Sequence, residues 1–189
     1  MSKNLKTIAI ALLVTVSTIV TAQTKKVDAS KSTISWVGKK LSGSHSGTIR
    51  IKEGNLLFKG KKLTGGNFTV NTSSIEVTDL KSGQGKENLE GHLKAEDFFG
   101  TDKYPTSKLV FKTITNKGNG VYTVTADLTI KEITNSVKFD LVVKRNTATT
   151  SFKVDRTKYG IKYNSGNFFE NLGDKVINDE FDLAVSLQF

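Results

Sequence analysis

The segment from Val121 to Val143, which reads VYTVTADLTIKEITNSVKFDLVV, constrains the fold most because its apolar and polar residues alternate in two successive runs. A period of two residues is typical of a β-strand with one buried face and one exposed face. The apolar faces consist of Tyr122, Val124, Ala126, Leu128 and Ile130, then Val137, Phe139, Leu141 and Val143. The segment therefore predicts a β-hairpin with its turn in Glu132–Ser136 and strands long enough to run the height of a barrel or sandwich.

The first 22 residues have the features of a secretory signal peptide. Met1–Lys6 carries two lysines and no acid, Thr7–Val20 is apolar, and Val20-Thr21-Ala22 forms a small-residue cleavage site before Gln23. A transmembrane anchor is the alternative, but the apolar stretch is shorter than the roughly 20 residues that span a bilayer. We therefore expect residues 1–22 to be a signal peptide and residues 23–189 to form one domain that is exported to the periplasm or secreted.

The mature chain is basic and contains no cysteine. It carries 26 Lys and Arg residues against 18 Asp and Glu residues, a net charge of +8. Without disulfides or a lipidated cysteine, the fold must depend on core burial. The lysines lie at outward strand positions and in turns, so we interpret them as a solvated basic surface able to attract anionic lipid. No nucleic-acid partner is expected, because the chain lacks the recognition motifs of that class.

Further strand signals precede and follow the hairpin, separated by turns rich in glycine and lysine. They are Lys25–Val37, Thr48–Lys52, Asn55–Lys59, Asn67–Val77, Leu109–Thr115, Ala148–Arg156 and Val176–Phe189, with Leu41–Gly47 as a loop. Only Lys86–Lys94 has the spacing of a helical face, followed by a turn at Glu96–Phe99. Closure removes the exposed edges of a sheet. The predicted fold is therefore all-β, an eight-stranded antiparallel β-barrel with one short helical segment.

The outward face of this barrel is too charged to meet lipid. Lys138, Asp140, Lys144, Glu180 and Asp182 all lie opposite the apolar stripe. A charge on the lipid-facing side of a membrane barrel costs up to about 4 kcal/mol at the bilayer midplane. We therefore expect a barrel that does not span a membrane and whose apolar face is turned inward.

The inward face offers two interpretations that the sequence does not separate. A closed barrel with this lining is either packed solid or encloses a dry, elongated apolar pocket. The predicted interior includes Trp36, Ile49, Phe68, Tyr122, Val124, Leu128, Phe139, Phe152 and Phe181. What this apolar face encloses is the functional question.

Arg156 continues the inward register of Phe152 and Val154. A buried guanidinium needs a carboxylate or an anionic ligand, because an unpaired buried charge is very costly. An ion pair with Asp174 or Asp179 at the barrel mouth is the favoured interpretation, and a ligand phosphate is the alternative.

Catalytic and metal-binding signals are weak. His45 and His92 are the two histidines, and neither has an acid at ligand spacing in the sequence. There is no cysteine nucleophile and no Gly-x-Ser-x-Gly pattern. We therefore predict no catalytic residue, metal or cofactor. An enzyme that uses His45 or His92 is an alternative, and it requires the histidines to meet each other or an acid in a cleft.

Four segments, taken together and in order, resemble the YceI-like family of lipocalin-like exported proteins associated with polyisoprenoid binding. They are GHLKAEDFFGTDKYP (Gly91–Pro105), DLTIKEITNSVKFD (Asp127–Asp140), FKVDRTKYGI (Phe152–Ile161) and LGDKVINDEFDLAVSL (Leu172–Leu187). The family elements fall at His92, Leu93, Asp97, Phe98, Phe99, Tyr104, Pro105, Asp155 and Arg156. The chain departs from the family pattern at Glu90-Gly91. It also departs at Glu132, where glycine is usual in the family.

The resemblance implies a lipocalin-like barrel with the helix near one end and an elongated apolar channel for a long isoprenoid chain. The expected function is an exported carrier of a polyisoprenoid, an isoprenoid quinone or another long-chain amphiphile. The expected ligand-binding residues are Trp36, Ile49, Phe68, His92, Leu93, Phe98, Phe99, Tyr122, Val124, Leu128, Phe139, Phe152, Arg156 and Phe181. The alternative is a non-catalytic stress-response or interaction module with a filled core. The oligomeric state is left open, a homodimer included.

Overall fold

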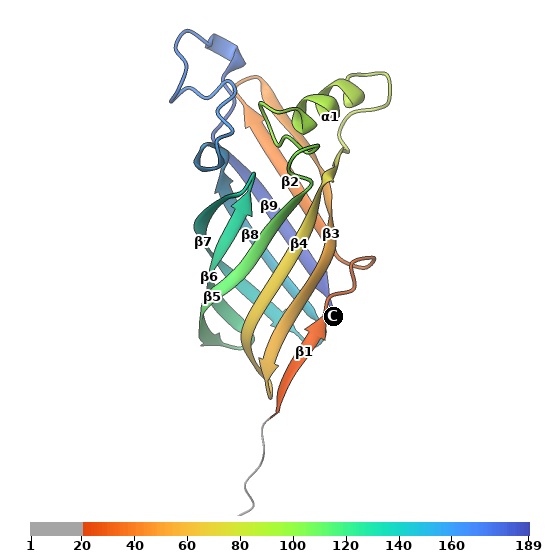
Figure 1. The fold of residues 1–189 in the computed structure, drawn as a ribbon, viewed down its shortest axis with the longest axis vertical. Coiled ribbons are helices and arrows are strands. Elements are labelled where there is room, and N and C mark those ends of the chain that lie inside the picture. Colours follow the sequence, from red (N-terminus) through yellow and green to blue (C-terminus); the bar gives the residue numbers. More distant parts are fainter. Residues whose placement is uncertain (1–20) are drawn as a thin grey trace, which may run out of the picture.

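The structure is a computed structural model, and it describes residues 21–189 (Figure 1). The predicted signal peptide lies outside the described residues except for Thr21 and Ala22. The strands are β1 (Ala22–Lys26), β2 (Thr33–Lys40), β3 (Gly43–Lys59), β4 (Lys62–Val77), β5 (Thr106–Gly118), β6 (Val121–Ile130), β7 (Ile133–Lys144), β8 (Thr147–Asp155) and β9 (Glu180–Gln188). The helix α1 spans Lys86–Lys94, and two 3-10 helices span Arg156–Tyr159 (η1) and Gly173–Lys175 (η2).

The strands form one closed antiparallel barrel. The order runs β3-β2-β9-β8-β7-β6-β5-β4, and β4 pairs back onto β3. The first half of β3 pairs with β2, and its last residues pair with β1. Strands β1 and β2 therefore lie along the same edge of β3, one beyond the other. The barrel has eight strand positions although the sheet has nine strands. The prediction of an eight-stranded antiparallel barrel with one helix is confirmed.

The up-and-down connectivity gives the barrel two different ends. The β3–β4, β5–β6 and β7–β8 turns lie at one end, which we call the turn end. The β2–β3 hairpin, α1, the β6–β7 turn and the long connection from η1 to η2 lie at the other, which we call the α1 end (Figure 1).

The central hairpin forms as its pattern predicts. β6 and β7 pair in register from Val121 opposite Val142 to Ile130 opposite Ile133. Along β6 every second residue is buried. The turn is shorter than expected, because β7 already begins at Ile133 and only Lys131 and Glu132 lie between the strands. Both have a left-handed backbone, with φ of 49° and 62°, which suits the twist of a two-residue hairpin turn.

The helix α1 has the predicted bounds and is held to the barrel by polar contacts. The Glu90 carboxylate accepts a hydrogen bond of 2.9 Å from the backbone N–H of Val77 at the end of β4. The turn after α1 is fixed by Lys131, whose Nζ donates to the carbonyl oxygens of Glu96 and Phe98 at 2.6 and 2.8 Å. This clamp holds Phe98 in place over the α1 end, where it is buried.

The turn end of the barrel is filled by side chains. Leu56 and Leu63 are buried beside the β3–β4 turn, and Tyr122 and Val124 are buried beside the β5–β6 turn. The Tyr122 hydroxyl accepts a hydrogen bond of 3.4 Å from the backbone N–H of Leu63. Close packing of this kind is typical of a protein core. Any internal space must therefore lie nearer the α1 end.

Candidate functional site

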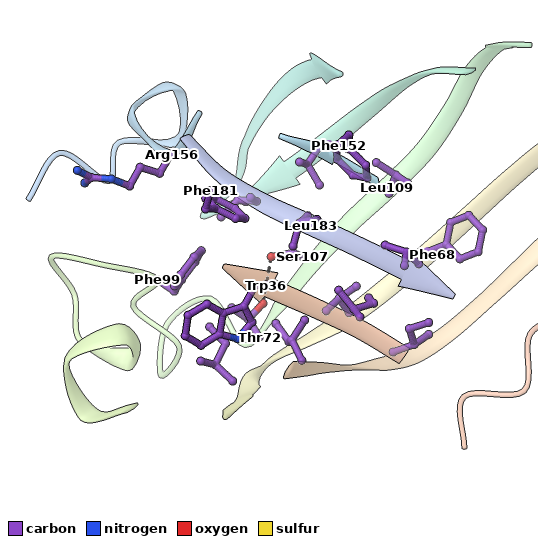
Figure 2. Close-up of a pocket in the computed structure, with 18 of the residues that line it drawn as sticks. Trp36, Phe68, Thr72, Phe99, Ser107, Leu109, Phe152, Arg156, Phe181 and Leu183 are labelled. Carbon is purple, nitrogen blue, oxygen red and sulfur yellow. Dashed lines mark hydrogen bonds between the residues drawn. The ribbon is translucent and has the colours of Figure 1, made fainter. Parts of the chain in front are cut away.

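A cavity of about 200 Å³ lies inside the barrel between the filled turn end and the α1 end (Figure 2). A single buried water needs only about 10–15 Å³ by the same kind of measure, so the cavity exceeds a water site more than tenfold. Along β9 its lining runs from Phe181 to Leu187, which is about 20 Å at the rise of a β-strand. The barrel is therefore hollow over an elongated part of its length.

Most of the predicted ligand-binding residues line this cavity. They are Trp36, Ile49, Phe68, Leu93, Phe98, Phe99, Leu128, Phe139, Phe152, Arg156 and Phe181. Side chains from every strand of the closed ring contribute to the wall. The alternation of apolar and polar residues along the strands identified the inward face, and the residues on this face line the cavity.

The structure places Tyr122, Val124 and His92 away from the cavity wall. Tyr122 and Val124 face inward as expected, but they belong to the filled turn end. A period of two residues assigns a side chain to a face of the sheet and says nothing of its height along the barrel. His92 lies on α1, where its ring meets Tyr163 edge-on at 4.5 Å and Phe98 at 5.0 Å. His92 therefore packs against Phe98, which lines the cavity, and does not line the cavity itself.

Several wall residues were not predicted as ligand-binding. The apolar ones include Ile34, Val70, Ile75, Leu109, Phe111, Ile177, Val185 and Leu187. The alternation signal along β4, β5 and β9 contained most of them. No sequence pattern indicated the polar pair Thr72 and Ser107, which sits in the wall where β4 pairs with β5.

Thr72 and Ser107 form a pair of hydroxyl groups in a mostly apolar wall. Their hydroxyl oxygens are 3.0 Å apart, and Thr72 is buried (Figure 2). Two hydroxyl groups carry two hydrogens, and only one of these can lie between the two oxygens. The second hydroxyl hydrogen is therefore not used within the pair.

A glycine makes room for the only tryptophan. Trp36 extends from β2, and a Cβ on Gly47 in β3 would lie 2.5 Å from the Trp36 ring. The Trp36 Nε1 donates to the carbonyl oxygen of Thr48 at 3.3 Å. The ring is therefore laid flat against the β3 backbone, and its single donor is satisfied.

Arg156 is engaged by groups of the protein itself. Its Nε donates to the carbonyl oxygen of Asn178, its Nη1 to those of Ile161 and Tyr163, and its Nη2 to that of Ile177, at 2.8–3.1 Å. Asp179 Oδ1 lies 3.5 Å from Nη2, which completes an ion pair. Burial lowers the pKa of Arg156, and Asp179 opposes that shift.

A guanidinium has five N–H donors, and four carbonyl oxygens accept from four of them. Nη2 also lies at ion-pair distance from Asp179, whose buried Oδ1 accepts no hydrogen bond. Of the two acids that the sequence offered as ion-pair partners, Asp174 and Asp179, it is Asp179 that lies beside the guanidinium. The arrangement favours the ion pair over a ligand phosphate, and the long connection between η1 and β9 is held around this guanidinium.

Each histidine meets one aspartate, which the sequence spacing did not predict. His45 Nδ1 lies 2.9 Å from Asp79 Oδ2, and His92 Nε2 lies 3.1 Å from Asp97 Oδ2. Burial alone would raise the pKa of Asp79, but hydrogen bonds from the Ser46 N–H and from His45 outweigh it and lower that pKa. Neither histidine lines the cavity. Within residues 21–189, no group of three or more His, Cys, Asp or Glu residues could hold a metal ion.

A helix that could cross a bilayer is absent from residues 21–189. A closed eight-position barrel with a helix at one end and an apolar interior defines the lipocalin-like class of proteins. Residues 26–189 match the YceI-like domain, and the chain belongs to that family.

The curated relatives are UPF0312 proteins. One from Shewanella denitrificans is 31% identical over 85 residues, which cover 45% of this chain and 42% of the relative. One from Staphylococcus aureus is 38% identical over 89 residues, covering 41% of this chain and 49% of the relative. A longer match, 26% identical over 145 residues, covers 75% of this chain and 71% of a Photorhabdus laumondii protein. The first two matches thus span less than half of each relative's length.

Solved structures share the fold. Burkholderia cenocepacia BcnA superposes with a TM-score of 0.68 at 22% identity, covering 85% of this chain and 98% of BcnA. A polyisoprenoid binding domain from Saccharophagus degradans, implicated in plant cell wall breakdown, has a TM-score of 0.58 at 11% identity and covers 86% and 95% of the two chains. A Campylobacter jejuni YCEI protein has a TM-score of 0.53 at 16% identity, covering 68% and 72%.

Proposed function

We propose that this protein is an exported binding protein that holds one long-chain lipid, a polyisoprenoid or an isoprenoid quinone, inside the barrel. The observation that carries the proposal is the elongated apolar cavity of about 200 Å³ above a filled barrel end. Small-molecule sites are concave and mostly apolar, with few polar groups that fix orientation. Family membership and the Saccharophagus degradans neighbour, described as a polyisoprenoid binding domain, support this choice of ligand class.

The chemistry of the wall favours a chain over a charged ligand. Burial of apolar carbon contributes about 0.8 kcal/mol per CH₂ before the cost of ordering the chain. Thr72 and Ser107 place two hydroxyl groups in this wall, and only one of their hydrogens is used between them. Arg156 donates to four carbonyl oxygens and is paired with Asp179, so its charge is already matched without a ligand phosphate. A quinone ring or a prenyl alcohol therefore suits this wall better than a prenyl phosphate.

Export is part of the proposal and is supported by the sequence of residues 1–22. Mass measurement of the protein recovered from cell fractions tests it, because cleavage after Ala22 leaves Gln23 as the first residue. An intact N terminus in the cytoplasmic fraction alone would contradict export.

The two competing functions have less support. An interaction module with a filled core fits only the turn end, because the rest of the interior is hollow. An enzyme that uses a histidine would place His45 or His92 at a substrate cavity, and neither lines this one. The family and its structural neighbours also favour a binding protein over an enzyme.

The test is lipid extraction from the purified protein, followed by uptake of a fluorescent prenyl alcohol. Val70→Trp places a large ring in the cavity wall, whereas Val110→Trp places the same ring on the outer face of the neighbouring strand, where Val110 is 43% exposed. We expect Val70→Trp to weaken uptake about tenfold or more and Val110→Trp to leave it unchanged. Equal uptake by both variants, or no uptake by the wild-type protein, would contradict the proposal.

A further inference from the structure

Large apolar side chains are exposed on the loops at the α1 end of the barrel. Leu41, at the tip of the β2–β3 hairpin, is 74% exposed, and Phe168 and Phe169, in the connection between η1 and η2, are 48% and 51% exposed. We call these three residues the rim cluster. Exposed phenylalanines side by side are unusual on a soluble surface and mark sites of interaction with protein or membrane.

The two loops that carry the rim cluster are joined by backbone contacts. Lys40 forms an isolated bridge with Ile177, and the N–H of Asn178 donates to the carbonyl oxygen of Lys39 at 2.9 Å. The N–H of Ile177 in turn donates to the carbonyl oxygen of Asn164 at 2.9 Å. The hairpin tip and the phenylalanine loop therefore form one surface beside the barrel mouth.

The phenylalanines are presented by a fixed turn. Ser165 is fully buried, and its carbonyl oxygen accepts hydrogen bonds from the N–H groups of Phe168 and Phe169 at 3.1 and 3.0 Å. The Asn167 side chain donates to Asp179 Oδ2 at 2.6 Å, which ties the turn to the Arg156 network. The backbone of this loop is thus ordered before any partner binds, so docking costs little further entropy.

A line of aromatic rings leads from this surface into the cavity. Tyr163, which is 36% exposed, lies 5.7 Å from Phe98 between ring centroids. Phe98 lies 6.3 Å from Phe99, and Phe99 lies 6.3 Å from Phe181 inside the barrel. Figure 2 shows Phe99 and Phe181 at the Arg156 end of the cavity. An apolar chain that leaves the cavity at this end passes along these rings and beside the Arg156 guanidinium, which lies 5.9 Å from the centre of the Phe98 ring.

The charges near the rim cluster are mixed, with an excess of lysine. Lys162 Nζ lies 4.3 Å from the centre of the Phe168 ring. Glu170 lies in the same connection, Lys158 lies in η1, Asp174 and Lys175 lie in η2, and Lys40 adjoins Leu41. Aromatic rings flanked by lysines are typical of protein segments that lie at the interface of an anionic bilayer.

We propose that the rim cluster inserts into the head-group region of a bilayer that contains anionic lipid and so docks the α1 end of the barrel onto a membrane surface. The role of this contact, transfer of the lipid between bilayer and cavity, rests on the proposed function. The contact itself does not, because it can be measured with an empty protein. The membrane is favoured over a protein partner because the rim cluster combines exposed apolar side chains with neighbouring lysines, which suits the surface of an anionic bilayer.

The test is co-flotation of the mature protein with vesicles of phosphatidylcholine and phosphatidylglycerol. The Phe168→Ser/Phe169→Ser variant removes two rings of the rim cluster, and Leu57→Ser/Val110→Ser removes two apolar side chains that are 37% and 43% exposed on the barrel wall. We expect the rim variant to lose about tenfold or more in vesicle affinity and the wall variant to match the wild type. Added salt should weaken wild-type binding, because it screens the lysines.

Uptake of a prenyl alcohol without vesicles separates the two proposals. Normal uptake by the rim variant, together with its loss of vesicle binding, supports docking. A wild-type protein that takes up the alcohol but does not bind vesicles, or a rim variant that binds vesicles as tightly as the wild type, would overturn docking alone. Failure to bind either vesicles or the alcohol would overturn both proposals. A wild-type dimer that the rim variant converts to a monomer, without vesicle binding, would assign this surface to a second copy of the chain.

Discussion

Replacement of Arg156 tests whether this residue holds the fold or the ligand. Arg156→Met keeps an apolar stem and removes the guanidinium, which donates to four carbonyl oxygens and pairs with Asp179. Arg156 is 4% exposed, and the Asp179 side chain is 18% exposed. The variant therefore leaves four acceptors without their donors and a carboxylate without its counter-charge in a poorly solvated place.

The expected cost is about 3–5 kcal/mol, the range for removal of one partner from a buried ion pair. A larger sum from separate hydrogen bonds is not expected, because the contacts share one side chain and are not additive. Asp179→Asn in the Arg156→Met background removes the unpaired charge and should restore about 1–2 kcal/mol of that loss. Arg156→Lys should be intermediate at best, because an ammonium group cannot reproduce the planar set of donors.

Urea unfolding followed by Trp36 fluorescence measures these changes. Prenyl alcohol uptake, measured at low temperature where the variant is folded, provides the second readout, and we expect it to be preserved. An unchanged unfolding midpoint together with lost binding of a prenyl phosphate would refute the reasoning, because that result would place the guanidinium on the ligand.

Two further predictions concern single residues at the α1 end. Burial, with a smaller effect of Asp155, raises the pKa of Tyr159 to about 12 from its ordinary value of 10.0. The stabilisation from the neutral Tyr159 side chain is therefore complete below about pH 10 and is lost as pH rises toward 12. The unfolding free energy of the wild type should fall by up to about 2.7 kcal/mol relative to Tyr159→Phe over that range. Unfolding free energies of the two proteins that change with pH in parallel would contradict this prediction. Glu132→Gly should stabilise the protein by about 1 kcal/mol, because Glu132 adopts φ of 62° in the hairpin turn. Thermal unfolding checks this, with Glu53→Gly in a strand as the destabilised control.

The parts of the fold that the sequence predicted are those with strong local periodicity. The central hairpin, the helix at Lys86–Lys94 and the closing strand each follow one pattern over several residues, although the closing strand begins at Glu180 and not at Val176 as predicted. The strand β3 was divided in two because Gly54 resembled a turn. In the structure Gly54 faces Phe68 across the β3–β4 pair, and a Cβ there would lie 2.5 Å from the Phe68 ring. A glycine that leaves room for a neighbour cannot be told from one that turns the chain without knowledge of the pairing.

The sequence predicted which side chains face the barrel interior, but not where along the barrel the cavity lies. Inward alternation found Phe139, Phe152 and Phe181 on the wall, but it gave Tyr122 the same weight although Tyr122 fills the turn end. Two of the four carbonyl acceptors of Arg156, those of Ile161 and Tyr163, come from a connection with no periodicity, and the other two come from residues just before β9 that the sequence assigned to the closing strand. Such contacts depend on the closed path of the chain, which local pattern does not encode.

The hollow interior is itself a cost to stability. At about 24 cal/mol per Å³ of cavity, a volume of about 200 Å³ corresponds to about 5 kcal/mol of lost packing. That is comparable to the whole unfolding free energy of many domains, about 5–15 kcal/mol. The filled turn end and the Arg156 network hold the two ends of the barrel in place, and they offset this loss while leaving the middle open. A bound chain would restore the missing contacts, so the packing that the empty barrel gives up becomes binding energy for its proposed cargo.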